Sequence, residues 1–429
     1  MVKIMKKYAL PVFIIAVLLS LGAFYFCNSE AKAGKSVSAD LSVGPSLVSA
    51  SDTVYRRIEA ADAPIESEFQ QASFAENVLE ISNDELDVIS AKYDAIGVQC
   101  AVIENGFVTG SYVFGLADRE SGKAVTQNTK YRVASLSKLF TNMVFMALVD
   151  SGRASLDADI SDYYGFSVRN PAYPDTPITP RMLMTHTASV ADGSLFDYSL
   201  ENASSVSIRQ LLTDGSSYSA YKPGTHHAYS NLSNALVGSV CELASDVCFE
   251  DLAQSLFLDP LKLDAGYEAA SIESREDIGL LYGGSSTLKS QLAAKFSPVL
   301  GQTVHLVQGN LTISATDYAQ LLCMLLNDGC AADGTRLLSE KSVSELLRVQ
   351  FNNGGELVGL GSFIYEGAVE DRTVFAHTGS AYGMYACYMF DPDTADGVVV
   401  LTSGARYATD PQTGVYSICA ELIRALLPQ

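Results

Sequence analysis

Positive charge is scarce in this chain of 429 residues. Lysine and arginine together number 28, against 49 aspartates and glutamates, and the formal net charge is −21 at pH 7. No basic cluster downstream of the N-terminus interrupts this acidic balance. A strongly negative molecule repels nucleic acid and anionic membrane surfaces. The sequence therefore argues against a nucleic-acid partner.

Cofactor motifs are absent as well. The chain contains no C-x-x-C, H-E-x-x-H or P-loop pattern. His226 and His227 are adjacent on an extended segment, where neighbouring side chains point in opposite directions, so we do not expect them to chelate one metal ion. The sequence thus predicts neither a metal nor another cofactor. Hydrophobic residues make up 48% and charged residues 18%, which is typical of a globular enzyme with a substantial core.

The N-terminus has the features of a targeting segment. Lys3, Lys6 and Lys7 precede an apolar run over 8–26, and a small-residue cleavage site ends at Ala33. The run is long for a signal peptide and close to the roughly 20 residues that span a bilayer. Residues 1–33 are therefore either a cleaved signal peptide or an N-terminal membrane anchor whose lysines stay inside. Both alternatives predict an extracytoplasmic protein, secreted in one case and held at the membrane in the other.

The rest of the chain divides into a linker and one folded region. Residues 34–80 are rich in Ser and Ala with little periodicity, which is typical of a linker. Strand patterns occupy 98–103 and 107–116 and, near the C-terminus, 361–365, 374–378, 384–390 and 397–401. A mostly helical stretch runs from 135 to about 325, and a last helix covers 414–427. This order predicts, over 81–429, an α+β fold with an antiparallel sheet built from both ends, flanking helices and a mostly helical second lobe.

Eight cysteines are present, seven of them beyond the targeting segment. Cys241 and Cys248 are seven positions apart, and so are Cys323 and Cys330. An exported chain permits two short local disulfides. Buried free thiols are the other alternative, and the spacing does not decide between them.

Three short motifs carry the chemistry. In chain order they are S-x-x-K at Ser135 and Lys138, Y-x-N at Tyr229 and Asn231, and H-T-G at His377, Thr378 and Gly379. On a helix, a spacing of three places the serine and the lysine on one face, about 5–6 Å apart at Cβ. A serine hydroxyl needs such a neighbouring base to become a good nucleophile. The second motif adds a phenol and an amide, and the third adds hydrogen-bond donors on a predicted strand.

Together these motifs resemble those of the serine β-lactamases and penicillin-binding proteins, in particular the branch of class C β-lactamases, DD-peptidases and related esterases. The segments 148–157, 178–187, 223–225 and 314–317 extend the resemblance from about Ile81 to the C-terminus. The chain departs from the family at Ala188-Ser189, where Ser-Gly is usual, and at His377, where the lactamases carry lysine. The resemblance implies the β-lactamase/DD-peptidase-like fold, with 81–429 as its catalytic domain.

The resemblance also implies a role for each motif residue. Ser135 is the expected nucleophile, and either Tyr229 takes its proton or the Lys138–Tyr229 pair shares it. Asn231 is expected to hydrogen-bond Lys138 and the substrate amide. His186 matches a structural position at a helix end.

The third motif is expected to lie on a strand beside the substrate. His377 and Thr378 would bind it, Gly379 would let it approach the backbone, and the amides of Ser135 and Ser380 would stabilise the oxyanion. The lactamase lysine offers a fixed positive charge to the substrate carboxylate, whereas a histidine with a pKa near 6.5 is mostly neutral at pH 7. This departure weakens the case for an efficient β-lactamase.

The resulting hypothesis is an extracytoplasmic serine hydrolase that forms an acyl-enzyme on Ser135. The expected substrates are D-Ala-D-Ala cell-wall peptides or related small amides and esters, as for a DD-peptidase. A class C-type β-lactamase or an esterase is the alternative. A catalytically silent protein that senses cell-wall fragments or binds penicillin is a more distant one, and the intact Ser135, Lys138, Tyr229 and Asn231 argue against it.

Overall fold

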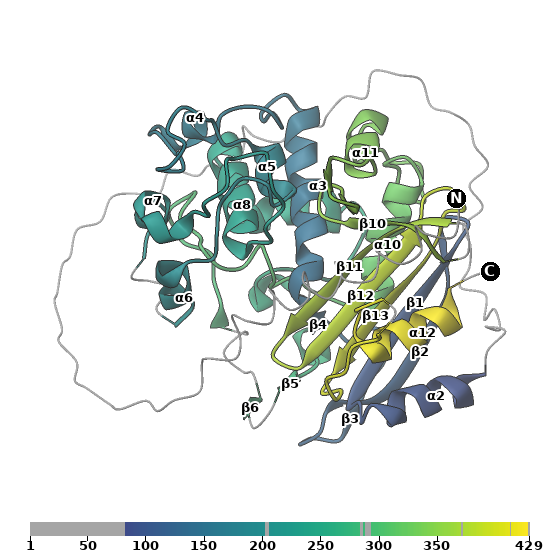
Figure 1. The fold of residues 1–429 in the computed structure, drawn as a ribbon. Helices are drawn as coiled ribbons and strands as arrows, with labels where there is room; N and C mark the ends of the chain where they lie inside the picture. The colour runs from purple at the N-terminus through teal and green to yellow at the C-terminus, as the bar shows by residue number, and fades with distance from the viewer. Residues whose placement is uncertain are drawn as a thin grey trace, which may run out of the picture.

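The two ends of the folded region share one β-sheet. The computed structural model describes residues 82–201, 206–283, 286–287, 293–369, 372–411 and 413–427, so the expected signal peptide or anchor (1–33) and linker (34–80) lie outside the described residues. Within the described part, nine strands form an antiparallel sheet in the order β3-β2-β1-β13-β12-β11-β10-β9-β8 (Figure 1). Their bounds are β1 Gly97–Glu104, β2 Phe107–Asp118, β3 Lys123–Ala124, β8 Phe351–Asn353, β9 Glu356–Val358, β10 Phe363–Val369, β11 Arg372–Ala381, β12 Met384–Asp391 and β13 Asp396–Ser403.

The strand pairing joins distant parts of the chain. β1 pairs with β13, with Gly97 opposite Ser403, and β11 pairs with β12, with His377 opposite Tyr388. The predicted hairpin is the β1–β2 pair, and the four strands expected near the C-terminus are β10 to β13. The prediction of an antiparallel sheet built from both ends is therefore confirmed.

Helices cover both faces of this sheet. Val98, Cys100 and Val102 of β1 belong to one hydrophobic cluster, whereas Ala101 and Ile103, which alternate with them, belong to the other. Because side chains alternate across a strand, a strand that is buried throughout needs packing partners on both of its faces. The partners are α2 (Asn83–Lys92) and α12 (Ser417–Leu426) on one face and α10 (Ala315–Leu326) on the other (Figure 1).

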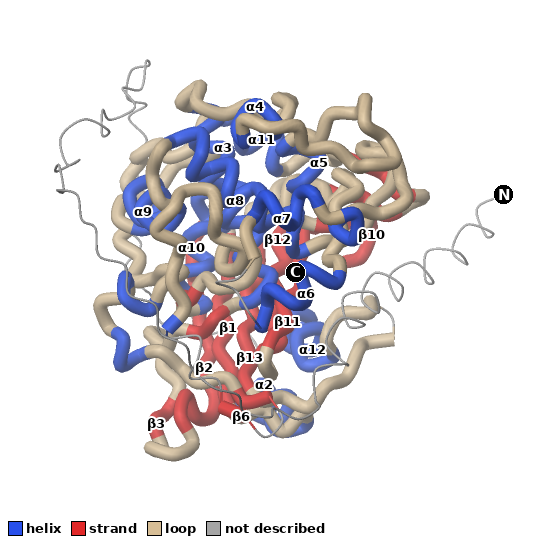
Figure 2. The backbone as a smooth tube through the Cα atoms, turned by 90° about the vertical axis from the view of Figure 1, so that its left-hand side faces the viewer, coloured by secondary structure: helices blue, strands red, loops and turns tan. Residues whose placement is uncertain are grey.

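The remaining helices form the second lobe. Figure 2 shows α3, α4, α5 and α8 gathered above the strands. Their order in the chain is α3 Ser137–Asp150, α4 Ile160–Tyr164, α5 Pro180–Met184, α6 Ser194–Glu201, α7 Ile208–Thr213, α8 Asn231–Ser245, α9 Phe249–Ala253 and α11 Glu340–Leu346. Short strand pairs join β4 (Tyr131–Arg132) to β7 (Thr312–Ile313) and β5 (Tyr282–Gly283) to β6 (Ser286–Thr287). A helical lobe beside a sheet was the predicted arrangement.

Two local features, the start of α3 and the state of four cysteines, bear on the sequence-based predictions. Ser135 does not begin the long helix as expected: it lies in a single 3-10 turn (η2, Ala134–Leu136), and α3 starts at Ser137. The backbone N–H groups of Leu136 and Ser137 donate to carbonyls three residues back, those of Val133 and Ala134, which makes this turn a 3-10 turn. The second concerns the cysteine pairs Cys241/Cys248 and Cys323/Cys330, which are free thiols rather than disulfides.

The helices of the described residues are short compared with a bilayer. Among them, no single helix has both the length and the apolar composition of a membrane span. One bent pair, Asn231–Ser245 with Phe249–Leu258, meets both criteria only when its two helices are taken together across an 84° bend.

Candidate active site

The expected nucleophile sits on a tight turn between β4 and α3. Ser135 is partly exposed, while Ala134 and Leu136 on either side of it are buried. The turn is braced by β11, because a Cβ atom on Gly379 would lie 2.5 Å from the Val133 carbonyl oxygen. Glycine at this position therefore lets the strand approach the nucleophile turn, in addition to the expected approach of substrate.

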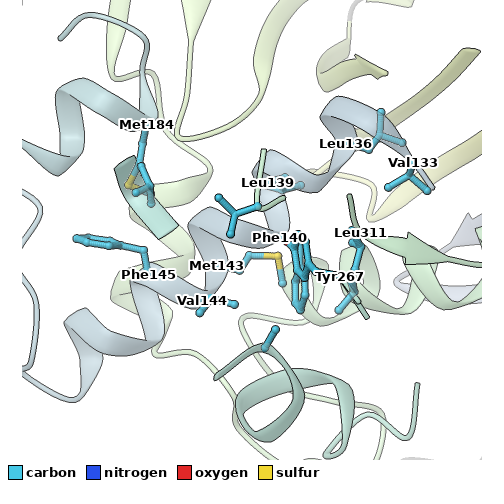
Figure 3. Packing of buried hydrophobic residues seen from close by; sticks show 14 of the residues in the cluster. Val133, Leu136, Leu139, Phe140, Met143, Val144, Phe145, Met184, Tyr267 and Leu311 are labelled. Atoms are coloured by element: carbon cyan, nitrogen blue, oxygen red, sulfur yellow. The ribbon is translucent and has the colours of Figure 1, made fainter. Parts of the chain in front are cut away.

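Helix α3 anchors this turn in the core. Leu136, Leu139, Phe140 and Met143 all belong to the main hydrophobic cluster, and Figure 3 shows them packed against the neighbouring segments. The ring of Phe140 stacks on Tyr267 with centroids 6.2 Å apart. A close-packed core of this kind holds side chains in single rotamers. The first turn of α3 therefore presents its polar residue in a fixed position.

That polar residue is Lys138, whose side chain makes three polar contacts. Its Nζ lies 2.9 Å from Ser135 Oγ, 2.9 Å from Asn231 Oδ1 and 2.8 Å from the Gln308 carbonyl oxygen. The residue is only 1% exposed. Burial lowers the pKa of Lys138 to about 7; the charge of Asp192 opposes this shift and that of Arg132 adds to it. A lysine with this pKa is partly neutral at pH 7 and can accept a proton.

Tyr229 approaches the same serine from the other side of the site. Its hydroxyl donates to Ser135 Oγ at 2.9 Å, and Lys138 Nζ lies 5.0 Å from the centre of its ring. Burial raises the pKa of Tyr229 well above 10, with the hydrogen bond to Ser135 opposing the shift. The phenol is thus protonated at rest. Of the two expected bases, Lys138 is the group whose protonation state can change near neutral pH.

Asn231 is held by a residue that the sequence analysis did not single out. The carboxylate of Asp192 accepts from Asn231 Nδ2 at 2.9 Å and from the backbone N–H groups of Asn231 and Leu232 at 3.0 and 2.9 Å. It also accepts from Ser230 Oγ at 2.8 Å. This carboxylate at the N-terminus of α8 satisfies backbone donors that have no partner within the helix. It also directs the Asn231 oxygen toward Lys138.

The H-T-G motif lies on β11 beside the nucleophile turn. Pairing with β10 ends at Ala376, so within the described strands the stretch from His377 to Ala381 pairs only with β12. His377 is 6% exposed, and its Nδ1 donates to the Thr378 carbonyl at 2.7 Å. Burial, reinforced by the charge of Lys138, lowers the pKa of His377 to about 3. His377 is therefore neutral at physiological pH. The sequence, on the basis of an ordinary histidine pKa near 6.5, predicted only that it is mostly neutral.

The other histidines have separate environments. His186 directly follows α5, accepts from the backbone N–H of Ser230 at 3.3 Å and packs 4.4 Å from the Tyr229 ring, which fits the predicted structural role. His226 stacks on Tyr221, whereas His227 Nδ1 lies 3.1 Å from a carboxylate oxygen of Glu356. The two neighbouring histidines thus turn to different partners, as expected.

A family model and several known proteins are similar to this chain. The family model described as "Beta-lactamase" matches residues 76–418. Penicillin-binding protein 4 of Amycolatopsis lactamdurans is 24% identical over 81% of this chain and 91% of its own length. A β-lactamase of Yersinia enterocolitica is 23% identical over 71% of this chain and 73% of its own. Esterase EstB of Burkholderia gladioli is 27% identical over a shorter region, 42% of this chain and 48% of its own.

Solved structures share the fold. A class C β-lactamase from Rhodobacter sphaeroides superposes with a TM-score of 0.60 at 19% identity, covering 77% of this chain and 96% of that one. The octameric penicillin-binding protein homologue from Pyrococcus abyssi gives a TM-score of 0.61 at 20% identity, covering 75% and 74%. The predicted β-lactamase-like α+β fold is confirmed. The chain belongs to the β-lactamase family of serine hydrolases, which includes β-lactamases, penicillin-binding proteins and esterases.

Proposed function

We propose that this protein is an extracytoplasmic serine hydrolase that forms an acyl-enzyme on Ser135. Its proposed substrates are D-Ala-D-Ala cell-wall peptides or related small amides and esters. The observation that carries the proposal is the position of Ser135 Oγ, which lies 2.9 Å from Lys138 Nζ and 2.9 Å from the Tyr229 hydroxyl. A serine held between a proton acceptor and a proton donor is arranged for covalent catalysis.

Lys138 and Tyr229 have different protonation states at rest and therefore different roles in proton transfer. Neutral Lys138 takes the proton of Ser135 as Oγ attacks the carbonyl carbon. Tyr229, which stays a phenol at rest because burial raises its pKa, gives its proton to the departing group and regains one from Lys138. The bond to the leaving group breaks and an ester on Ser135 remains. Water then attacks this ester, and the same pair moves its protons in reverse.

Charge that develops on the substrate oxygen needs donors in place. The backbone amides of Ser135 and Ser380 are the proposed oxyanion donors, from the turn before α3 and from β11 respectively. Asn231 uses Oδ1 for Lys138 and one Nδ2 proton for Asp192. Its second Nδ2 proton is left for the substrate amide.

One observation favours an esterase as the second candidate. His377 is buried and its pKa is lowered to about 3, so it brings no positive charge to a substrate carboxylate. A D-Ala-D-Ala peptide and a penicillin both carry such a carboxylate, whereas a simple ester does not. Esterase activity is therefore the alternative that this site supports next, ahead of β-lactamase activity.

The proposed location follows from the N-terminal sequence. The charged and apolar order of residues 1–33 supports export, either with anchoring in the membrane or with release after Ala33. Fractionation of cells that express the full chain tests this: activity in the cytoplasmic fraction alone would contradict export.

Covalent labelling tests the proposed activity. A fluorescent penicillin and a fluorophosphonate are applied to the wild type, to Ser135→Ala and to Ser137→Ala, followed by turnover of D-Ala-D-Ala peptides, penicillins and p-nitrophenyl esters. Ser137 is the matched control because it is a buried serine two positions on, whose hydroxyl donates to the Ala134 carbonyl at 2.7 Å and accepts from the Leu311 amide at 3.1 Å. We expect Ser135→Ala alone to lose labelling. A wild type without label or turnover would instead favour the silent binding protein.

A further inference from the structure

Arg132 is a cation near the proposed nucleophile, and no acidic side chain of the described residues forms an ion pair with it. It lies on β4, three positions before Ser135, and is only partly exposed. None of the ion pairs formed by the described residues includes it. Long charged side chains that are not on the open surface are generally paired. We therefore expect the unpaired guanidinium of Arg132, next to the proposed nucleophile, to bind an anionic ligand.

Two contacts hold the guanidinium in place. Its Nε donates to the Gly309 carbonyl at 2.6 Å, and its Cζ lies 4.8 Å from the centre of the Tyr382 ring. Tyr382 also takes part in a side-chain hydrogen bond with Arg132, and its ring orients the planar guanidinium, which has five N–H donors in all. Tyr382 itself is 41% exposed, so this side of the pair is open to solvent.

The contacts also place Arg132 close to the catalytic groups. Gly309 follows Gln308, whose carbonyl accepts from Lys138 Nζ, so the two cations are bound to consecutive carbonyls. A Cβ atom on Gly309 would lie 3.7 Å from a terminal nitrogen of Arg132 and 3.9 Å from the carbonyl of Ala134, the residue before the nucleophile. The charge of Arg132 accordingly contributes to lowering the pKa of Lys138.

His377 lies on β11, whereas Arg132 of β4 contacts Tyr382, the residue directly after the end of β11. His377 precedes Ser380, the proposed oxyanion donor, and Tyr382 follows it. In the family's lactamases the lysine that His377 replaces meets the substrate carboxylate, which in a D-Ala-D-Ala peptide belongs to the leaving group. The Tyr382 end is therefore the side of the acyl group. In this chain the Tyr382 end of the site therefore carries the cation Arg132, and the His377 end is neutral.

We propose that Arg132, supported by the ring of Tyr382, binds a carboxylate on the acyl part of the substrate, so that the enzyme prefers acyl donors with an acidic side chain. The proposal rests on the acyl-enzyme function described above and adds the substrate class. An arginine fork matches the two oxygens of a carboxylate, and a site that is partly shielded from water strengthens the contact. The neutral His377 end would then accept an uncharged leaving group.

Paired esters that share one leaving group test this preference. The p-nitrophenyl monoesters of succinic and glutaric acid carry an acidic acyl group, and p-nitrophenyl butyrate and valerate are their neutral counterparts. We expect the wild type to show a higher kcat/KM for the acidic esters, with the difference shrinking as salt is added. In Arg132→Gln the kcat/KM for acidic esters should fall roughly 10- to 100-fold, the range for a hydrogen-bonded charge. That for neutral esters should change much less, and Arg132→Lys should recover part of the loss.

Two further variants separate recognition from folding. Arg406→Gln is the matched control, because Arg406 also lies over a tyrosine ring, 5.7 Å from the centre of Tyr93, but on an exposed part of the domain away from Ser135. Arg406→Gln should leave unchanged the ratio of kcat/KM for the acidic esters to kcat/KM for the neutral esters. Tyr382→Asn removes the supporting ring and keeps a residue that tolerates the φ of 55° at this position; it should reduce the ratio without loss of the fold.

The outcomes distinguish this proposal from the one it rests on. Hydrolysis of neutral esters with no preference for acidic ones would overturn the role of Arg132 and leave the acyl-enzyme intact. An equal loss on both ester classes in Arg132→Gln would show that Arg132 acts through Lys138 or the fold, and would also overturn it. A wild type that neither turns over any ester nor reacts with a fluorophosphonate would contradict the proposed function itself.

Discussion

Asp192 fixes Asn231 through its backbone and its side chain together: Asp192 Oδ2 lies 3.0 Å from the Asn231 amide nitrogen and 2.9 Å from Nδ2. An amide side chain that donates to a carboxylate must present its oxygen in the opposite direction. That oxygen is the one 2.9 Å from Lys138 Nζ. The carboxylate thus sets the position of the lysine amine without touching it.

Replacing Asp192 should therefore affect both stability and chemistry. In Asp192→Ala, the donors of Ser230, Asn231 and Leu232 lose their acceptor, and we expect the free energy of unfolding to fall by about 1–3 kcal/mol. Acylation should slow as well, because Asn231 no longer holds Lys138. Urea unfolding and rapid-quench labelling measure the two effects. Asp197→Ala, at an exposed carboxylate on α6, is the control, and equal behaviour of both variants would contradict the role of Asp192.

Acylation should depend on pH through Lys138. Its neutral form is the proton acceptor, so kcat/KM for a neutral ester should rise with pH, pass its midpoint near 7 and level off above it. His377 should not contribute, since its pKa is lowered to about 3. The pH profile of His377→Gln should consequently keep the same midpoint. Loss of the inflection in that variant would assign it to the histidine instead.

Tyr229→Phe removes the proton donor and keeps the ring. We expect the fold to persist and the acylation rate to fall by roughly 10²–10⁴, the usual contribution of a positioned acid or base. Stopped-flow measurement with a chromogenic ester and a thermal melt give both values. A rate within about threefold of wild type would remove Tyr229 from the mechanism.

His377→Lys should improve the capture of penicillins relative to neutral esters. A lysine restores a positive charge where the substrate carboxylate is expected, worth about 1 kcal/mol if exposed and more if shielded from water. The new charge would also lower the pKa of nearby Lys138 further, which affects all substrates alike. The informative quantity is therefore the ratio of acylation efficiencies for penicillin and p-nitrophenyl ester at pH 7, with salt added in a second series. An unchanged ratio would show that position 377 does not recognise charge.

Patterns of neighbouring residues were sufficient to predict the strands and the pairing of Ser135 with Lys138. The spacing of Ser135 and Lys138 acts within one helical turn, and the alternating strands at both ends of the chain indicated the shared sheet. The structure brings Tyr229 to Ser135 and Asn231 to Lys138, which their order along the chain could not establish. Their catalytic roles stay predictions until the variants are measured.

Other parts of the site leave little trace in the sequence. Asp192 acts across 39 positions on Asn231, and an isolated aspartate in a loop has no pattern that marks it. The Gln308 group that binds Lys138 is a backbone carbonyl, which every residue possesses. The pKa of Lys138 depends on its burial by distant segments. Such contacts exist only once the chain is folded, so local spacing could not predict them.

The pairing of β1 with β13 also constrains when the domain can form during synthesis. Gly97 meets Ser403 only after about 300 further residues have been made, which takes roughly 15–60 s at typical translation rates. During that interval the hairpin of β1 and β2 has one long, apolar edge without its partner strand. Exposed edges of this kind invite pairing with other chains. Completion of the chain, rather than emergence of its N-terminal half, is thus the earliest moment at which this edge can be covered.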